Sequence, residues 1–269
     1  MPFTTSHPAM VLPLKQIWPD RFSLTGLVAG AMAPDLLYFL MSVTTYRGVS
    51  HSWPGLVSFC LPAGILFAVA FHRLFKYTFL SNLPRPLDRI FSGMAEKVFR
   101  PAGFRGWPVL GYSVLIGSLS HFFWDSFTHP TGQIAQMIPF LTDQGTILGI
   151  TRSYARFLQH LSTVLGGVAF LLFLFRSRFM PPPTRTSPLH KPGEKLRFWL
   201  VCGLVALVYA CLAVWFYNWL YHWQIGLGYN RSLAWMTFGL GGWAGFFWTV
   251  CVYSIARRFI RTKPGSETV

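Results

Sequence analysis

The chain has 269 residues, of which 52% are hydrophobic, 17% aromatic and only 12% charged, and its mean hydropathy is +0.42. Soluble globular chains carry about 25% charged residues, so this composition argues against a soluble protein and favours an integral membrane protein. The formal net charge of +15 calls for an anionic partner, which is either nucleic acid or the headgroup surface of a membrane.

The N-terminal region predicts a short helix followed by a long apolar span. Residues 8–18 suit a short apolar helix with Ser6 as its N-cap. A polar turn then leads into an apolar stretch near residues 23–43. Eleven helical residues rise about 17 Å, so His7 and Asp35 are expected at one level. The short helix is then re-entrant, because it is too short to cross the bilayer.

Apolar runs of about 18 or more residues are typical of membrane-spanning helices. Six such runs are found, near residues 23–43, 53–75, 107–127, 157–175, 198–221 and 233–256. The predicted fold class is all-α, a polytopic membrane bundle of about six transmembrane helices plus the re-entrant helix. Residues 1–269 are expected to form a single integral membrane domain, with a cytoplasmic linker at 176–197 and two C-terminal spans within 198–256.

Lys and Arg residues are concentrated in alternate connections. The basic ones are Arg73, Lys76, Arg85, Arg89, Lys97, Arg100 and Arg105, then Arg176, Arg178, Arg185, Lys191, Lys195 and Arg197, then Arg257, Arg258, Arg261 and Lys263. This alternation is what the positive-inside rule predicts for six spans with a cytoplasmic C-terminus. The basic loops therefore suit anionic lipid headgroups, and a nucleic-acid partner is not expected.

Several ionisable residues fall at the outer side of the predicted spans, where acids and histidines are costly and usually functional. In SHFFWDSFTH, residues 120–129, His121, Asp125 and His129 are spaced four and four and share one helix face. Asp35 follows a proline that disturbs its helix. The full set is His7, Asp35, His51, His121, Asp125, His129 and His160.

Imidazole and carboxylate groups are the ligands that zinc and similar ions prefer where thiolates are absent. The four cysteines lie inside apolar spans without a CxxC pair, so they are expected to be buried small hydrophobes. The sequence therefore predicts a metal site with Asp125 as the bridge between ions. Two or three ions in one pocket generate hydroxide at neutral pH and clamp a phosphoryl group.

The order of these residues resembles that of the zinc-dependent phospholipase C superfamily, which has an N-terminal His, an Asp before a His, an HxxxD helix followed by another His, and a later His. The segments MPFTTSHPAMVLPL, GAMAPDLLYF, SHSWPG and GSLSHFFWDSFTHPTG also resemble a family of bacterial membrane proteins that begin MPFT-x-SHP. That family is similar to inner-membrane metal-dependent hydrolases with PD, RGxxHS and GxxSHxxxD motifs, which appear here at Pro34-Asp35, Arg47–Ser52 and Gly117–Asp125.

The resemblance covers about residues 1–165 and implies a helical core like that of the phospholipases, carrying the metal site. It implies that Asp35, His51, His121 and Asp125 hold one ion, that His7 and Asp125 hold a second, and that His129 and His160 hold a third. The phospholipases have a Glu four residues after the late His, where this chain has Val164. Two zinc ions are therefore favoured over three, with another divalent metal as an alternative.

The function implied is a membrane-embedded, zinc-dependent hydrolase of a lipid phosphoester, of phospholipase C or lipid phosphatase type, in the bacterial inner membrane with its site toward the outer side. A metal-activated water attacks, Asp35 orients or deprotonates it, and Asp125 completes the catalytic pair. Arg47 suits bidentate pairing with the substrate phosphate, or else is an interfacial anchor. The alternatives are an ion or metal transporter that uses the His/Asp cluster, and a non-catalytic membrane protein with a structural metal.

Overall fold

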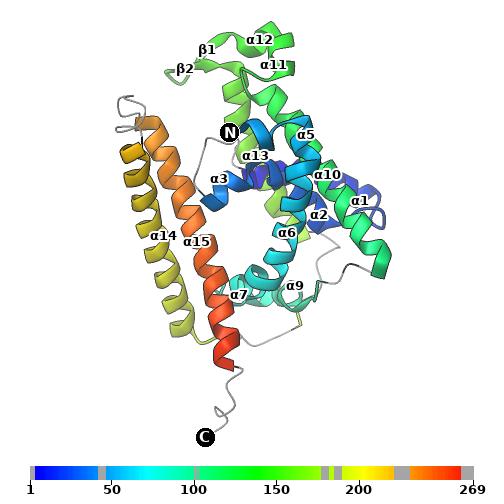
Figure 1. Ribbon diagram of the computed structural model, residues 1–269, viewed down its shortest axis with the longest axis vertical. Coiled ribbons are helices and arrows are strands. Elements are labelled where there is room, and N and C mark those ends of the chain that lie inside the picture. Colours follow the sequence, from blue (N-terminus) through cyan, green and yellow to red (C-terminus); the bar gives the residue numbers. More distant parts are fainter. Residues whose placement is uncertain are drawn as a thin grey trace, which may run out of the picture. The chain divides into compact units, whose positions relative to one another are not determined.

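A computed structural model of the protein describes residues 4–41, 47–99, 101, 103–176, 182–184, 190–220 and 231–261 (Figure 1). The elements before residue 100 are η1 (Thr4–Val11), α1 (Leu12–Ile17), α2 (Leu24–Met32), η2 (Ala33–Asp35), α3 (Leu36–Met41), α4 (Arg47–Ser50), α5 (Trp53–Gly55), η3 (Leu56–Cys60), α6 (Leu61–Ala70), η4 (Phe71–Phe75), α7 (Lys76–Ser81), α8 (Leu87–Ile90) and α9 (Ser92–Glu96). The later elements are α10 (Gly103–Thr128), α11 (Gln133–Met137), α12 (Pro139–Thr142), β1 (Gln144–Ile147), β2 (Ile150–Ser153), α13 (Tyr154–Arg176), α14 (Pro192–Leu220) and α15 (Arg231–Arg261).

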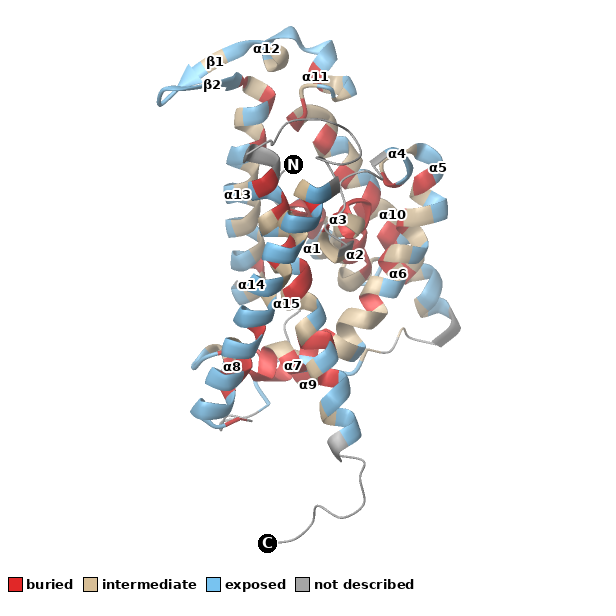
Figure 2. Cartoon of the chain, turned by 60° about the vertical axis from the view of Figure 1, so that its left-hand side comes forward, coloured by how far each residue is buried: buried red, intermediate tan, exposed pale blue. Residues whose placement is uncertain are grey.

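Four helical stretches are long and apolar enough to cross a membrane: Trp53–Ser81, Tyr154–Phe175, Pro192–Trp219 and Ala234–Phe259. Many of their apolar side chains are exposed, and α14 is exposed along most of its length (Figure 2). Exposed apolar helices of this length are stable in lipid and unstable in water. The protein is thus a predominantly helical integral membrane protein, as the sequence predicts.

The other two predicted spans have a different character. Leu24–Leu40 is an apolar helical stretch but a shorter one, interrupted by the 3₁₀ turn η2 at Pro34, as expected from the missing proline N–H. Helix α10 has 26 residues but is not among the four strongly apolar stretches. The count of six spans therefore stays a prediction, as does the re-entrant position of the N-terminal helix.

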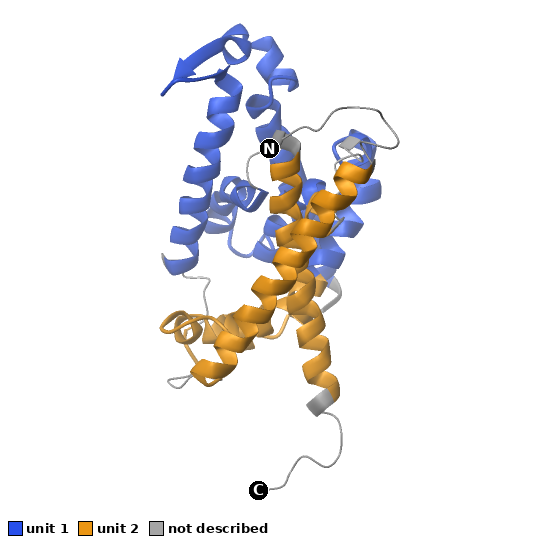
Figure 3. Cartoon of the chain, turned by 90° about the vertical axis from the view of Figure 1, so that its left-hand side faces the viewer, with its two compact units in different colours: residues 1–35, 47–68, 100–180 blue, residues 36–46, 69–99, 181–269 orange. Residues whose placement is uncertain are grey.

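The chain divides into two compact units (Figure 3). Unit 1 comprises residues 1–35, 47–68 and 100–180, and unit 2 comprises residues 36–46, 69–99 and 181–269. The candidate metal ligands all belong to unit 1. The single membrane domain expected from the sequence stays a prediction. Residues 177–181 and 185–189 of the expected linker at 176–197 lie outside the described residues. Helix α14 already begins at Pro192, so residues 192–197 are helical.

In unit 1, α2 and α10 pack with their backbones in contact. A Cβ atom built on Gly30 would lie 2.0 Å from the carbonyl oxygen of Val114, and one on Gly117 would lie 2.3 Å from that of Leu27. Ser118 Oγ donates to the Gly30 carbonyl at 3.0 Å. Small residues that allow such close approach are typical of helix pairs in membranes, and here they bring His121 of α10 against the end of α2.

The N-terminal segment folds as expected into a short helical piece, η1 and α1, followed by a turn and α2. Ser6 does not cap it, however, because its hydroxyl donates to the Thr163 carbonyl of α13 at 2.7 Å. The cap in this region is Ser23, whose side chain accepts from Gly26 N at the start of α2. Ser6 instead fastens η1 to α13, and Val11 is buried against Leu27.

Strands β1 and β2 form an antiparallel hairpin that the sequence analysis did not predict. The pairing runs from Gln144 with Ser153 to Ile147 with Ile150. Leu148 and Gly149 form the turn with φ of 50° and 76°, the left-handed conformations that a two-residue hairpin turn needs. With α11 and α12, the hairpin lies at one end of α10 and α13 (Figure 1).

Unit 2 is built around the α14–α15 pair. Cβ atoms on Gly241 and Gly245 of α15 would lie 2.9 and 3.0 Å from the Cα atoms of Ala210 and Ala206 on α14, so these helices also approach closely. Buried Phe198, Cys202, Val250 and Cys251 form a core with Phe75. A buried ion pair, Lys195 Nζ to Asp88 Oδ2 at 2.5 Å, links α14 to α8.

Candidate metal centre

Two groups of potential metal ligands meet in unit 1. His7, His121 and Asp125 form one group, and Asp35, His51 and His121 form the other. Within each group the ligand atoms all lie within 4.8 Å of one another. His121 belongs to both groups, so the two form one continuous cluster of imidazoles and carboxylates.

His121 is the fixed centre of this cluster. Its side chain is fully buried on α10, and its Nδ1 lies 2.8 Å from the Ala31 carbonyl near the end of α2. Since a carbonyl only accepts, Nδ1 donates this hydrogen bond, and Nε2 faces the carboxylates of Asp35 and Asp125. Such a hydrogen bond from the second ring nitrogen is what orients metal-ligating histidines. The α2–α10 contact therefore sets the position of His121.

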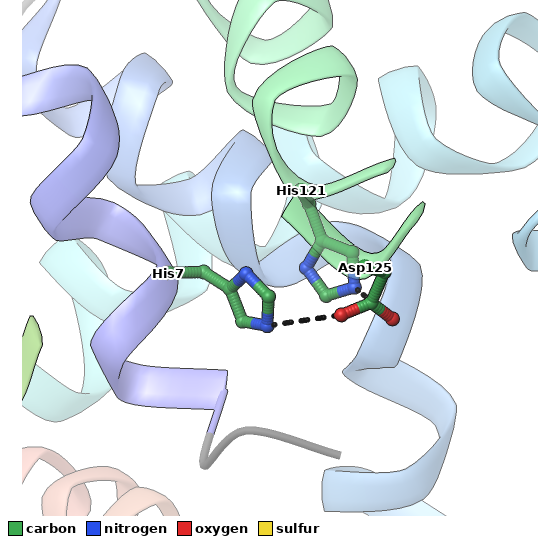
Figure 4. A group of neighbouring side chains, drawn as sticks. All are labelled: His7, His121 and Asp125. Atoms are coloured by element: carbon green, nitrogen blue, oxygen red, sulfur yellow. Dashed lines mark ion pairs between the residues drawn. The ribbon is translucent and has the colours of Figure 1, made fainter. Parts of the chain in front are cut away.

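Asp125 lies one helical turn after His121, and its carboxylate faces both His121 and His7 (Figure 4). His7 Nε2 lies 3.6 Å from Asp125 Oδ1, and His121 Nε2 lies 3.6 Å from Asp125 Oδ2. The His7 and His121 rings stack with centroids 3.9 Å apart. Burial in η1, outside the four apolar spans, lowers the pKa of His7 to about 3. The imidazole of His7 is therefore neutral, the form that binds metals.

Asp35 is fully buried at the 3₁₀ turn η2. Its Oδ1 lies 3.4 Å from His51 Nε2, and its Oδ2 lies 3.9 Å from His121 Nε2. Thr4 Oγ1 donates to Asp35 Oδ2 at 2.5 Å. His51 follows α4, and its Nδ1 lies 2.9 Å from Ser50 Oγ. One carboxylate is thus held by a threonine while facing two imidazoles.

These residues suit a metal ion because they are imidazoles and carboxylates, and because several of their polar atoms are buried without a hydrogen bond. Both nitrogens of His7, Nε2 of His121 and Oδ1 of Asp35 are buried and make no hydrogen bond in the described part of the chain. Buried polar atoms without hydrogen bonds cost free energy, and a cation relieves that cost. Two ligand atoms that each bind zinc at about 2.1 Å lie at most roughly 4.2 Å apart, which the separations of 3.4–3.9 Å satisfy.

The structure does not bring every predicted ligand into these groups. His129 is buried beside Asp125, but its Nδ1 lies 3.1 Å from the Asp125 backbone carbonyl and 3.5 Å from Asp125 Oδ1. That nitrogen therefore donates a hydrogen bond to the last turn of α10. His160 is exposed on α13. Arg47 begins α4, and its side chain lies outside what the structure describes. The third ion and the phosphate-pairing role of Arg47 stay predictions.

The sequence did not predict two buried polar residues of unit 1. Thr4 binds the Asp35 carboxylate, and its only signal in the sequence is its position two residues before the SHP motif. Gln159 is 1% exposed on α13, and its Nε2 has no hydrogen bond among the described residues. Gln159 directly precedes His160 on α13 and is buried, whereas His160 is exposed.

A family model described as a domain of unknown function, DUF4184, matches residues 1–255. The chain therefore belongs to the DUF4184 family. No curated protein and no solved structure matches it.

Proposed function

We propose that this protein is a membrane-embedded, metal-dependent hydrolase of a lipid phosphoester. The observation that carries the proposal is the buried cluster in which His121 is shared by two groups of potential ligands. A buried set of imidazoles and carboxylates is the ligand set of hydrolytic zinc centres. The resemblance of the ordered motifs to zinc-dependent phospholipases supports the same reaction class.

The residues take distinct roles in this proposal. Asp35, His51, His121 and Asp125 hold one zinc or similar divalent ion. His7 and Asp125 hold a second, with the Asp125 carboxylate as the bridge between the two ions. When bound, such ions lower the pKa of water toward neutrality and stabilise charge on a phosphoryl group. Asp35, fixed by Thr4, accepts the proton of the attacking water or orients it.

The membrane placement is part of the proposal. The alternation of basic connections supports six crossings in a bacterial inner membrane, with the C-terminus in the cytoplasm and anionic lipids at the basic loops. The cluster then lies toward the outer side. Arg47, one helical turn before His51, pairs with the substrate phosphate.

The test is the metal content and lipid hydrolysis of purified protein and of Asp125→Asn. We expect the wild type to carry zinc or a similar divalent ion and to release a phosphorylated headgroup or phosphate from phospholipid vesicles. Asp125→Asn removes a charged ligand at similar volume, so metal content falls and the rate drops by about 10²–10⁴-fold. Asp143→Asn is the matched control, because Asp143 is exposed outside the cluster. Equal metal content in all three proteins would overturn the proposal.

A further inference from the structure

A cavity of about 180 Å³ lies beside the cluster, within unit 1. Its wall is formed by η1, α10 and α13, and includes His7, Met10, Trp124, Leu158, Leu161 and Leu165. His7 is at the same time a member of the candidate metal group. The cavity therefore shares a side chain with the cluster.

The wall is apolar because its hydroxyl groups are turned to backbone carbonyls. Ser6 Oγ donates to Thr163 O at 2.7 Å, and Ser162 Oγ donates to Gln159 O at 2.9 Å. A Cβ atom on Gly166 would lie 2.8 Å from Ser6 O, so η1 rests directly on α13. The cavity thus lies where η1 contacts α13, and the atoms that a ligand would contact in it are mostly hydrocarbon.

The cavity is partly open on the side of α13. Leu161 and Leu165, which line it, are 55% and 59% exposed, and the neighbouring Val164 is 63% exposed. Helix α13 is one of the four stretches long and apolar enough to cross a membrane. Exposed leucines on such a helix face lipid chains, so the opening faces the hydrocarbon of the bilayer.

We propose that this cavity binds one hydrocarbon chain of a membrane phospholipid and thereby directs the phosphoester of that lipid to the His7 side of the cluster. The inference rests on the proposed function, which it deepens by naming where the lipid binds. An apolar cavity of roughly 150 Å³ takes up benzene, so this volume holds a segment of one chain. The phosphate stays outside the cavity, at the wall that carries His7.

Photolabelling of the full chain tests this directly. The protein is reconstituted in phosphatidylethanolamine and phosphatidylglycerol vesicles that contain phosphatidylglycerol with a diazirine on one acyl chain, and adducts are mapped by mass spectrometry. We expect adducts at Met10, Trp124 and Leu158–Leu165 in excess of those on the rest of α13. Leu161→Trp fills the cavity and lowers these adducts about tenfold, the loss of nearly two buried methylene groups.

Leu171→Trp is the matched control, since Leu171 is 54% exposed on the same helix but does not line the cavity. It should leave the cavity adducts unchanged. Uniform labelling along α13, as expected of ordinary surrounding lipid, would overturn the inference, and so would equal cavity labelling in Leu161→Trp.

Metal content separates this inference from the proposed function. Asp125→Asn loses metal but keeps the cavity adducts, because Asp125 does not line the cavity. Cavity adducts in a wild type that holds no metal and hydrolyses no lipid would support chain binding and refute the hydrolase. A metal-loaded, active wild type without cavity adducts would refute chain binding alone.

Discussion

His121 and Asp125 show how single residues set this site. Their spacing of four places both on one face of α10, which follows from the helical repeat alone. The hydrogen bond from His121 Nδ1 to Ala31 does not follow from it, because it depends on how closely α2 approaches. The spacing thus predicted the pair, but only the packed structure defines which nitrogen faces the carboxylates.

The same limit explains His129 and Thr4. His129 shares the face of Asp125, as its spacing predicts, yet its Nδ1 lies against the Asp125 backbone carbonyl, a local partner that competes at a helix end. Thr4 binds Asp35 across 31 positions of sequence. No periodicity indicates a contact of that range, so it could not be predicted from one sequence.

His190 in unit 2 allows a prediction of how the stability of the protein depends on pH. Its Nδ1 lies 3.3 Å from Glu194 Oε2, and its Nε2 lies 3.0 Å from Arg257 Nη1. Arg257 only donates, so Nε2 accepts and the ring is neutral. Burial, together with the charge of Arg257, lowers the pKa of His190, and Lys195 acts in the same direction while Glu194 opposes both.

A histidine with a lowered pKa in the folded state binds fewer protons than in the unfolded state, so stability rises with pH in the range below the unfolded value of about 6.5. We expect the melting temperature to fall as pH drops from about 7, and to fall less in His190→Gln, which keeps one donor and one acceptor but does not titrate. Melting of both proteins in detergent at several pH values measures this. Parallel pH profiles for the two would contradict it.

At the scale of elements, the glycines of α2 and α10 position the cluster. Gly117 of α10 lies against the backbone of α2, whereas a Cβ on Gly111 of the same helix would meet only Leu61 Cδ1 at 3.8 Å. Both positions are helical, so alanine improves helix propensity equally at each. Any difference between the two substitutions therefore reports the contact of α10 with α2.

We expect Gly117→Ala to separate α2 from α10, to lower stability by about 1–3 kcal/mol and to reduce metal content, because His121 loses the carbonyl that orients it. Gly111→Ala should be neutral or stabilise by up to about 1 kcal/mol. Thermal melting and elemental analysis of the two purified variants provide the comparison. The interpretation fails if the two variants melt alike and hold equal metal.

Helical elements were predictable to different degrees. The apolar runs of α13, α14 and α15 exceed the length that a membrane requires, so composition alone indicated them. The β1–β2 hairpin was not predicted, because only four residues form each strand. Its turn also needs Leu148 in the left-handed backbone conformation, which leucine rarely adopts. The π-helical segments η3 and η4 within Trp53–Ser81 likewise leave no periodic signal.

For the whole molecule, the chain passes between its units more than once: unit 2 takes residues 36–46 and 69–99 from within the sequence of unit 1. The potential metal ligands nevertheless come from separate segments of unit 1 alone. Hydropathy divides a chain into successive spans and does not indicate which spans pack together, so this division was not predictable. Of the residues in the ordered His/Asp motifs, the structure brings together His7, Asp35, His51, His121 and Asp125, whereas His160 is exposed on α13.

The topology of the whole chain gives the last prediction. Gln144 and Pro183 are both exposed and fall in connections of opposite basic content, so the positive-inside rule places Gln144 outside and Pro183 in the cytoplasm. The native cysteines Cys60, Cys202, Cys211 and Cys251 lie in the apolar stretches, where a membrane-impermeant maleimide does not react. We expect this reagent, added to intact cells, to label Gln144→Cys but not Pro183→Cys, and to label both after lysis. The wild type is the control for background labelling. Labelling of Pro183→Cys in intact cells would contradict the predicted orientation and would place the cluster on the cytoplasmic side.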